Sequence, residues 1–122
     1  MKGNIVRNEE RFVMRYNSVL DLHTHTVASG HAYCSLREMA KAASEKGLEV
    51  LGITEHAPSM PGTCHKFYFN NLKVVPREMY GIQLLLGSEV NILDAQGTVD
   101  LAQRTLERMD VCLLYTSDAA DD

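Results

Sequence analysis

Short apolar runs, separated by polar or glycine-containing segments, recur along most of the chain and predict buried strands. Three runs and the start of a fourth occupy Ser18–Leu20, Leu48–Thr54, Ile82–Leu86 and Asp110–Tyr115. The third run continues through Gly87 to Ile92. The second run is apolar over nearly its whole length, which is typical of a strand buried on both faces of a parallel sheet.

The segment between the first two runs has the periodicity of a helix. Ser35 and Glu38 form a capping-box pattern, and apolar residues follow at helical spacing. Gly47 ends this pattern, so we expect a helix over Leu36–Lys46. A strand, a helix and a strand in this order form a right-handed βαβ unit with parallel strands. The sequence therefore predicts an α/β fold with a parallel sheet.

Three further segments have weaker patterns. Pro76–Tyr80 is predicted to be a short helix with proline in its first turn. A second helix is expected after Asp100, with that side chain as its N-terminal cap. Ala57–Tyr68 is rich in proline, glycine, serine and methionine, and it is long enough to be a functional lid.

Composition and charge exclude several classes of protein. The chain has 122 residues, 45% hydrophobic and 23% charged, as expected for at most one globular domain. A net charge of −4 gives no basic surface that would favour nucleic acid as a partner. No apolar run is long enough to cross a membrane, and the polar N-terminus lacks the apolar core of a signal peptide. We therefore expect a cytoplasmic protein that does not bind membranes.

Cysteine usage agrees with this compartment. The three cysteines, Cys34, Cys64 and Cys112, are odd in number and irregularly spaced. This pattern argues against a disulfide framework and fits a reducing compartment.

Two histidines mark the end of the first predicted strand. In the run Asp21-Leu22-His23-Thr24-His25-Thr26, His23 and His25 are two positions apart, so their side chains point to the same face of a strand. Paired imidazoles at a strand end are good ligands for transition metals. The alternative interpretation is a pair of surface histidines at a sheet edge.

The other histidines strengthen the metal interpretation. All five lie between positions 23 and 65, and four of them (His23, His25, His31 and His56) lie at or just after predicted strand ends. Glu89 lies near the end of the third strand, where these ligands are expected to meet. Imidazole together with carboxylate favours zinc, manganese or iron over calcium or magnesium.

Several ordered motifs resemble the first motifs of the PHP (polymerase and histidinol phosphatase) superfamily. They are Asp21–Thr26, His31, Ile53-Thr54-Glu55-His56 and Gly87-Ser88-Glu89-Val90-Asn91. The segment Val27–Tyr33 resembles the YcdX-type phosphatase branch more narrowly. The resemblance implies the N-terminal part of a distorted (β/α)7 TIM-like barrel, with up to three zinc or manganese ions at the C-terminal ends of its strands.

The resemblance also implies a role for each candidate residue. His23 and His25 would hold the first metal ion, and Glu89 would bridge the first and second. His31 and His56 would hold the third ion. Asp21 and Glu55 would orient the imidazoles, while His65 matches a histidine of the long second loop and is a candidate substrate or loop contact.

The implied activity is metal-assisted hydrolysis of a small-molecule phosphate ester, in which Glu89 is the candidate catalytic residue. Two other activities of the superfamily, histidinol-phosphate phosphatase and exonuclease, would use the same early motifs. A metal-binding module without catalysis is an alternative from another class.

The chain departs from the family pattern in length. A complete barrel takes on the order of 250 residues, and the resemblance implies later histidines and an Asp-x-His pair, whereas His65 is the last histidine of this sequence. We therefore predict a poorly ordered leader over residues 1–15, a partial PHP domain over 16–111, and a fragment inactive alone. Residues 112–122 resemble a translated sequencing adaptor, and a genuine acidic tail is the alternative.

Overall fold

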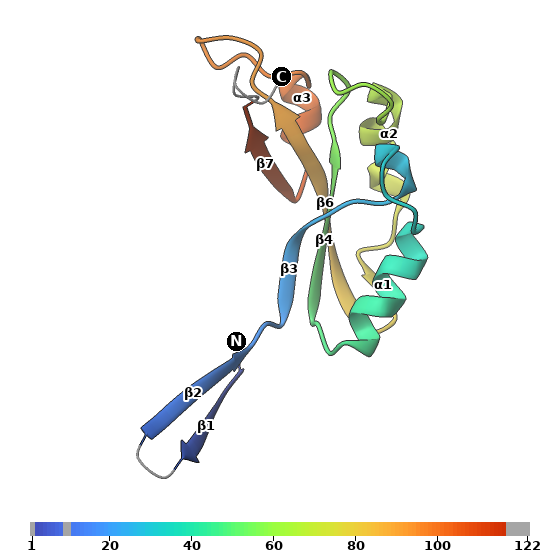
Figure 1. Ribbon diagram of the computed structural model, residues 1–122. Coiled ribbons are helices and arrows are strands. Elements are labelled where there is room, and N and C mark those ends of the chain that lie inside the picture. Colours follow the sequence, from blue (N-terminus) through green and yellow to red (C-terminus); the bar gives the residue numbers. More distant parts are fainter. Residues whose placement is uncertain (1, 9–10, 117–122) are drawn as a thin grey trace.

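A five-stranded sheet forms the centre of the chain (Figure 1). The computed structural model describes residues 2–8 and 11–116, and the side chains from residue 16 onward. Its four parallel strands are β3 (Leu20–Thr24), β4 (Val50–His56), β6 (Ile82–Asn91) and β7 (Val111–Tyr115). The short β5 (Glu78–Met79) is antiparallel to β6. The predicted α/β class and the parallel pairing are thus confirmed, and the parallel strands curl like part of a TIM-like barrel.

The predicted helix after the first strand is confirmed as α1 (Leu36–Glu45). Ser35 Oγ accepts a hydrogen bond from the backbone N–H of Glu38 at 3.2 Å, and Glu38 Oε1 accepts one from the backbone N–H of Ser35 at 3.0 Å. These two bonds satisfy backbone donors that the first helical turn leaves without partners. Gly47, with a φ of 82°, follows the helix.

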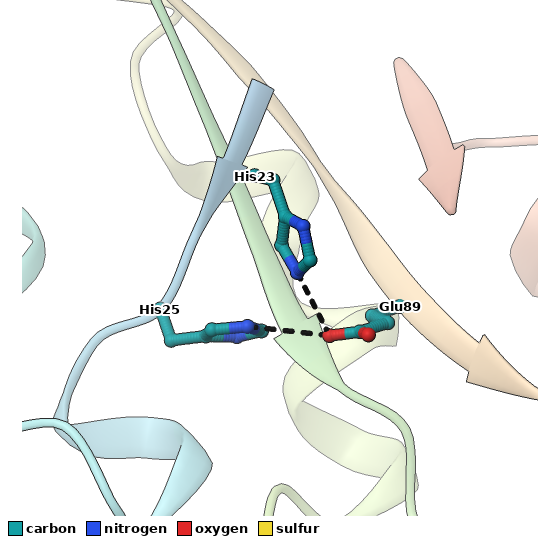
Figure 2. Close-up of side chains that lie close together, drawn as sticks. All are labelled: His23, His25 and Glu89. Atoms are coloured by element: carbon teal, nitrogen blue, oxygen red, sulfur yellow. Dashed lines mark hydrogen bonds and ion pairs between the residues drawn. The ribbon is translucent and has the colours of Figure 1, made fainter. Parts of the chain in front are cut away.

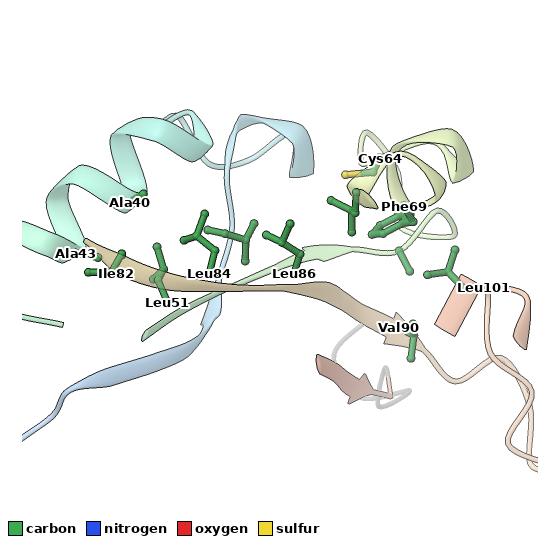
Figure 3. Packing of buried hydrophobic residues seen from close by; sticks show 13 residues of the cluster. Ala40, Ala43, Leu51, Cys64, Phe69, Ile82, Leu84, Leu86, Val90 and Leu101 are labelled. Carbon is green, nitrogen blue, oxygen red and sulfur yellow. The ribbon is translucent and has the colours of Figure 1, made fainter. Parts of the chain in front are cut away.

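Buried apolar side chains fill the space between the sheet and the helices α1 and α2 (Lys66–Asn70), which cover the same face (Figures 1 and 3). On β6 the buried residues Ile82, Leu84 and Leu86 alternate, as a strand covered on one side by helices requires. Ala40 of α1 is fully buried, because its small side chain lets the helix approach the sheet closely. This core fixes β4 and β6 side by side, and the candidate ligands lie at their ends.

Two strands, β5 and β7, pair with different parts of the same edge of β6. β5 pairs with Ile82 and Gln83 at the beginning of the strand, and β7 pairs with Gly87–Asn91 at its end. Between the two pairings, Asp110 Oδ2 accepts a hydrogen bond from the backbone N–H of Leu86 at 2.9 Å and from Arg77 Nε at 2.7 Å. The carboxylate thereby satisfies a strand donor that neither neighbour reaches.

The histidine motif lies farther inside its strand than the sequence indicated. The apolar run Ser18–Leu20 only leads into β3, which extends to Thr24, and Glu55 and His56 are the last residues of β4. The loop expected over 57–68 also contains the beginning of α2. It is followed by the 3₁₀ turn η2 (Leu72–Val74).

The prediction of a short helix over Pro76–Tyr80 is wrong. Glu78 and Met79 form β5, which turns back onto β6 through Tyr80 and Gly81. Both turn residues have positive φ, 52° and 76°, as a two-residue type I′ hairpin turn requires. The strand pairing of this hairpin outweighs the helical preference of proline at a first turn.

The expected cap at Asp100 is also wrong. The helix α3 covers only Gln103–Leu106, and its N-cap is Ala102. Asp100 instead accepts hydrogen bonds from the backbone N–H of Asn91 at 2.9 Å, from Asn91 Nδ2 at 2.8 Å and from the backbone N–H of Ser59 at 2.9 Å. The carboxylate therefore ties the loop before α3 to the end of β6.

The N-terminal segment forms an element that the sequence did not predict. β1 (Lys2–Asn8) and β2 (Arg11–Asn17) pair antiparallel as a separate two-stranded sheet, which projects from the central sheet in Figure 1. Within the described residues, none of the helices has the length and apolar character needed to cross a membrane.

We expect Tyr80→Asn to raise the free energy of unfolding by about 0.5–1 kcal/mol, because asparagine adopts positive φ at lower cost than tyrosine. Urea unfolding of the 122-residue chain measures this change. The matched control is Tyr33→Asn, at an exposed tyrosine without positive φ. Equal effects of the two substitutions would contradict the assignment of strain to the turn.

Candidate metal centre

The candidate ligands converge at the C-terminal ends of three parallel strands. His23 belongs to β3, His25 follows it, His56 ends β4 and Glu89 lies on β6. His56 and Glu89 are direct partners in the parallel register of β4 and β6. The predicted meeting of these side chains at one edge of the sheet is therefore observed.

Three imidazole nitrogens surround one carboxylate oxygen. Glu89 Oε2 lies 3.1 Å from His23 Nε2, 3.2 Å from His25 Nε2 and 3.3 Å from His56 Nδ1. Figure 2 shows the first two rings approaching the carboxylate from the end of β3. Of these three imidazole contacts, that of His23 also has hydrogen-bond geometry.

His31 joins this group through ring contacts. The rings of His25 and His56 are stacked, with centroids 4.2 Å apart and planes 6° apart. The His31 ring lies 4.6 Å from that of His56 and 6.2 Å from that of His25. Four of the five predicted histidines thus form one cluster.

His65 has a different role in the structure. It is the N-cap of α2, where its Nδ1 accepts a hydrogen bond from the backbone N–H of Phe67 at 3.1 Å. The ring contacts that connect the other four histidines do not extend to it within the described part of the chain.

A bulge in β3 helps to aim its histidines. Asp21 is paired with Leu51 and Thr24 with Ile53, so three steps along β3 match only two along β4. Gly52 lies opposite the bulge, where a Cβ atom would be 2.7 Å from Cα of Leu22. A glycine at this position is required for the two backbones to approach so closely.

The Glu55 carboxylate is fully buried and is satisfied by several donors. Its Oε1 accepts hydrogen bonds from the backbone N–H of Thr26 at 2.7 Å and from Ser29 Oγ at 2.9 Å. Its Oε2 accepts from the Thr26 hydroxyl and, at 3.4 Å, from the hydroxyl of Tyr68. His25 Nδ1 is 3.9 Å from Oε1, so the carboxylate lies directly behind the cluster.

Asp21 acts on the backbone rather than on a ring. Its Oδ1 accepts a hydrogen bond from the backbone N–H of His23 at 3.0 Å. Of the two carboxylates expected to orient imidazoles, Glu55 is the one that lies near a histidine ring.

Burial changes the protonation of several groups around the cluster. It lowers the pKa of His25 and of His56 below 6.5, against the opposing attraction of Glu89. Burial also raises the pKa of the Cys64 thiol to about 11, and the nearby Glu55 charge adds to this. The two central imidazoles are therefore neutral near pH 7, as metal binding requires.

The donor set fits a transition-metal ion. Ligand atoms of His23, His25 and Glu89 all lie within 4.8 Å of one another. An ion with tetrahedral bonds of about 2.0–2.1 Å separates its ligand atoms by about 3.3 Å, close to the contacts around Glu89. In addition, His56 Nδ1 is buried and has no hydrogen-bond partner among the described residues. An uncompensated lone pair of this kind is costly unless a cation or donor meets it.

Sequence reasoning missed Thr26, Ser29 and Tyr68. Thr26 and Ser29 lie at the 3₁₀ turn η1 (Val27–Ser29), for which Thr26 is the N-cap, and Tyr68 comes from α2. Their closeness in sequence to His25 was the one signal that Thr26 and Ser29 belong to the site. Their partner Glu55 is distant in sequence, so the contact itself could not be predicted.

Comparison with known proteins identifies one domain family and relatives named as probable phosphatases. A model of the PHP domain matches residues 21–121. A probable phosphatase of Clostridium novyi is 54% identical over 100 residues, covering 82% of this chain and 40% of that protein. A probable phosphatase of Caldanaerobacter subterraneus is 46% identical over 105 residues, covering 86% of this chain and 41% of that protein. The chain spans about two fifths of the length of these relatives.

We expect the metal-free chain to lose stability as the pH falls below about 6.5. The folded pKa of His25 and His56 is lowered, so the unfolded state binds more protons between the folded pKa and 6.5, and unfolding is favoured there. Urea midpoints measured in chelator from about pH 8 to about pH 5 test this, and His56→Asn should reduce the slope. A slope unchanged by that substitution would contradict the assignment.

Proposed function

Because the chain belongs to the PHP domain family, we propose that the protein containing it is a metal-dependent phosphatase that hydrolyses phosphoric monoesters. The observation that carries this proposal is the approach of three imidazole nitrogens to one oxygen of Glu89. The names of the relatives support the reaction class. The activity is proposed for the full-length protein, since the relatives are longer than this chain.

We propose that His23, His25 and Glu89 hold one ion, that Glu89 is shared with a second, and that His31 and His56 hold a third. Zinc and manganese suit this mixture of imidazole and carboxylate. When bound, such ions supply a water nucleophile that is ionised near neutral pH and positive charge for the phosphoryl oxygens.

The candidate ligands differ in how exposed their side chains are in this part of the protein. The His23 side chain is 56% exposed, whereas those of His25, His56 and Glu89 are 19%, 12% and 9% exposed. A phosphoryl group would therefore enter from the His23 side and meet a floor formed by the stacked rings of His25 and His56. The buried Glu55 network holds the loops that carry this floor.

The substrate is proposed to be a small-molecule phosphate ester. Histidinol-phosphate phosphatase and exonuclease activities would use the same strand-end ligands, so a panel of sugar phosphates, histidinol phosphate and single-stranded DNA separates these possibilities. Metal binding without turnover of any of them would favour a non-catalytic module.

We expect the full-length protein to hydrolyse p-nitrophenyl phosphate when zinc or manganese is present. Dialysis against chelator should abolish the activity, because the nucleophile and the charge for the phosphoryl oxygens come from the ions. Addition of either metal to the dialysed protein should restore it. Full activity of the metal-stripped protein held in chelator would contradict the proposal.

We expect Glu89→Gln to lower kcat/KM of the full-length protein at least ~100-fold, because loss of a direct ligand exceeds the ~10–100-fold effect of losing a partner that orients one. Initial rates at saturating metal measure the effect. Glu45→Gln, at an exposed carboxylate of α1, is the matched control and should change little. A near-normal rate for Glu89→Gln would place the shared ligand elsewhere.

A further inference from the structure

The hydroxyl of Ser29 is surrounded by three polar groups. Ser29 is fully buried at the end of η1, directly behind the histidine cluster. Its Oγ lies 2.9 Å from Glu55 Oε1, 3.0 Å from the backbone nitrogen of His56 and 3.4 Å from His25 Nδ1. One side chain thus contacts the loop after β3, the end of β4 and a candidate metal ligand.

The hydrogen-bonding capacity of a hydroxyl assigns a direction to each contact. A serine hydroxyl has one proton to donate and two lone pairs that accept. The Glu55 carboxylate can only accept, so the hydroxyl proton of Ser29 points to it. The backbone N–H of His56 can only donate, so it occupies one of the two lone pairs of Ser29 Oγ. The remaining lone pair faces His25, and this contact is a hydrogen bond only if Nδ1 carries a proton.

The other ring nitrogen of His25 is bound differently. His25 Nε2 is 3.2 Å from Glu89 Oε2, but within the described residues the hydrogen bond to that oxygen comes from His23. Within the described part of the chain, the contact with Ser29 is therefore the one contact of the His25 ring that has hydrogen-bond geometry. Because a neutral imidazole carries one proton, a proton on Nδ1 leaves a lone pair on Nε2.

We propose that Ser29 is a positioning residue that holds His25 in the Nδ1–H tautomer, so that the Nε2 lone pair faces Glu89 and is ready to bind a metal ion. Glu55 drives this arrangement by attracting the single Ser29 proton. Through its contact with the backbone of His56, the same hydroxyl fixes the second stacked ring relative to the first. The consequence for metal affinity rests on the proposed function, whereas the tautomer does not.

The tautomer can be measured directly in the metal-free chain. Long-range ¹H–¹⁵N correlation spectra, recorded in chelator at a pH where the ring is neutral, distinguish Nδ1–H from Nε2–H. We expect the 122-residue chain to show His25 as the Nδ1–H form. In Ser29→Ala the ring should shift toward Nε2–H, because Nδ1 then has only Glu55 Oε1 near it, at 3.9 Å, whereas Glu89 Oε2 lies 3.2 Å from Nε2. An Nε2–H ring or an even mixture in the unmodified chain would overturn the proposal, whether or not the variant folds.

Metal affinity provides a second readout, measured by competition with a chromophoric chelator. Ser29→Ala should weaken zinc binding about 10–100-fold, the usual effect of losing a group that orients a ligand. Ser88→Ala is the matched control, because Ser88 is equally buried and its hydroxyl donates to the Glu55 backbone carbonyl at 3.0 Å rather than to a histidine ring or a carboxylate. It should keep the His25 tautomer and bind zinc within about threefold of the unmodified chain.

The two proposals fail in different ways. An Nδ1–H ring in the 122-residue chain, together with a full-length protein that does not bind zinc, would contradict the metal site and leave the role of Ser29 intact. Tight zinc binding that Ser29→Ala and Ser88→Ala weaken equally would overturn the positioning role and leave the metal site intact.

Discussion

The buried charge of Glu55 is the constraint on which the architecture of the site depends. Moving a carboxylate out of water costs several kcal/mol unless hydrogen bonds replace its hydration. The required donors come from the turn after β3 and from α2, so these segments fold around the end of β4. The rings of His25 and His56 are attached to the segments that this network holds. The network thereby fixes the backbone from which both rings project.

Much of the architecture was predictable from local patterns. The helix α1 followed from its capping box and glycine end, and the strand-end cluster followed from the ordered histidines and Glu89. Both predictions rest on periodicity and on the rule that parallel strands bring their C-terminal ends to one edge. Neither depends on which residues of different strands are in register.

The errors arise where long-range pairing overrides a local preference. Asp100 has the residue type of a helix cap, yet the unpaired donors of Asn91 and Ser59 are within its reach and bind it instead. A tyrosine does not indicate positive φ, and the positive φ of Tyr80 follows from the pairing of β5 with β6. Ser29 could not be found for the same reason, because its importance appears only when Glu55 and His56 are brought beside it.

The bulge in β3 makes the number of residues in this strand important for the position of a candidate metal ligand. Its extra residue, accommodated by Gly52, sets which of the consecutive side chains Leu22 and His23 faces Glu89. Deleting one of the two would remove the bulge and disturb the placement of the imidazole on the ligand side while the sheet stayed paired. An evolutionary insertion or deletion at this point would thus change coordination chemistry rather than shape. The number of residues between Asp21 and Thr24 is therefore part of the ligand geometry, in addition to the identity of the residues themselves.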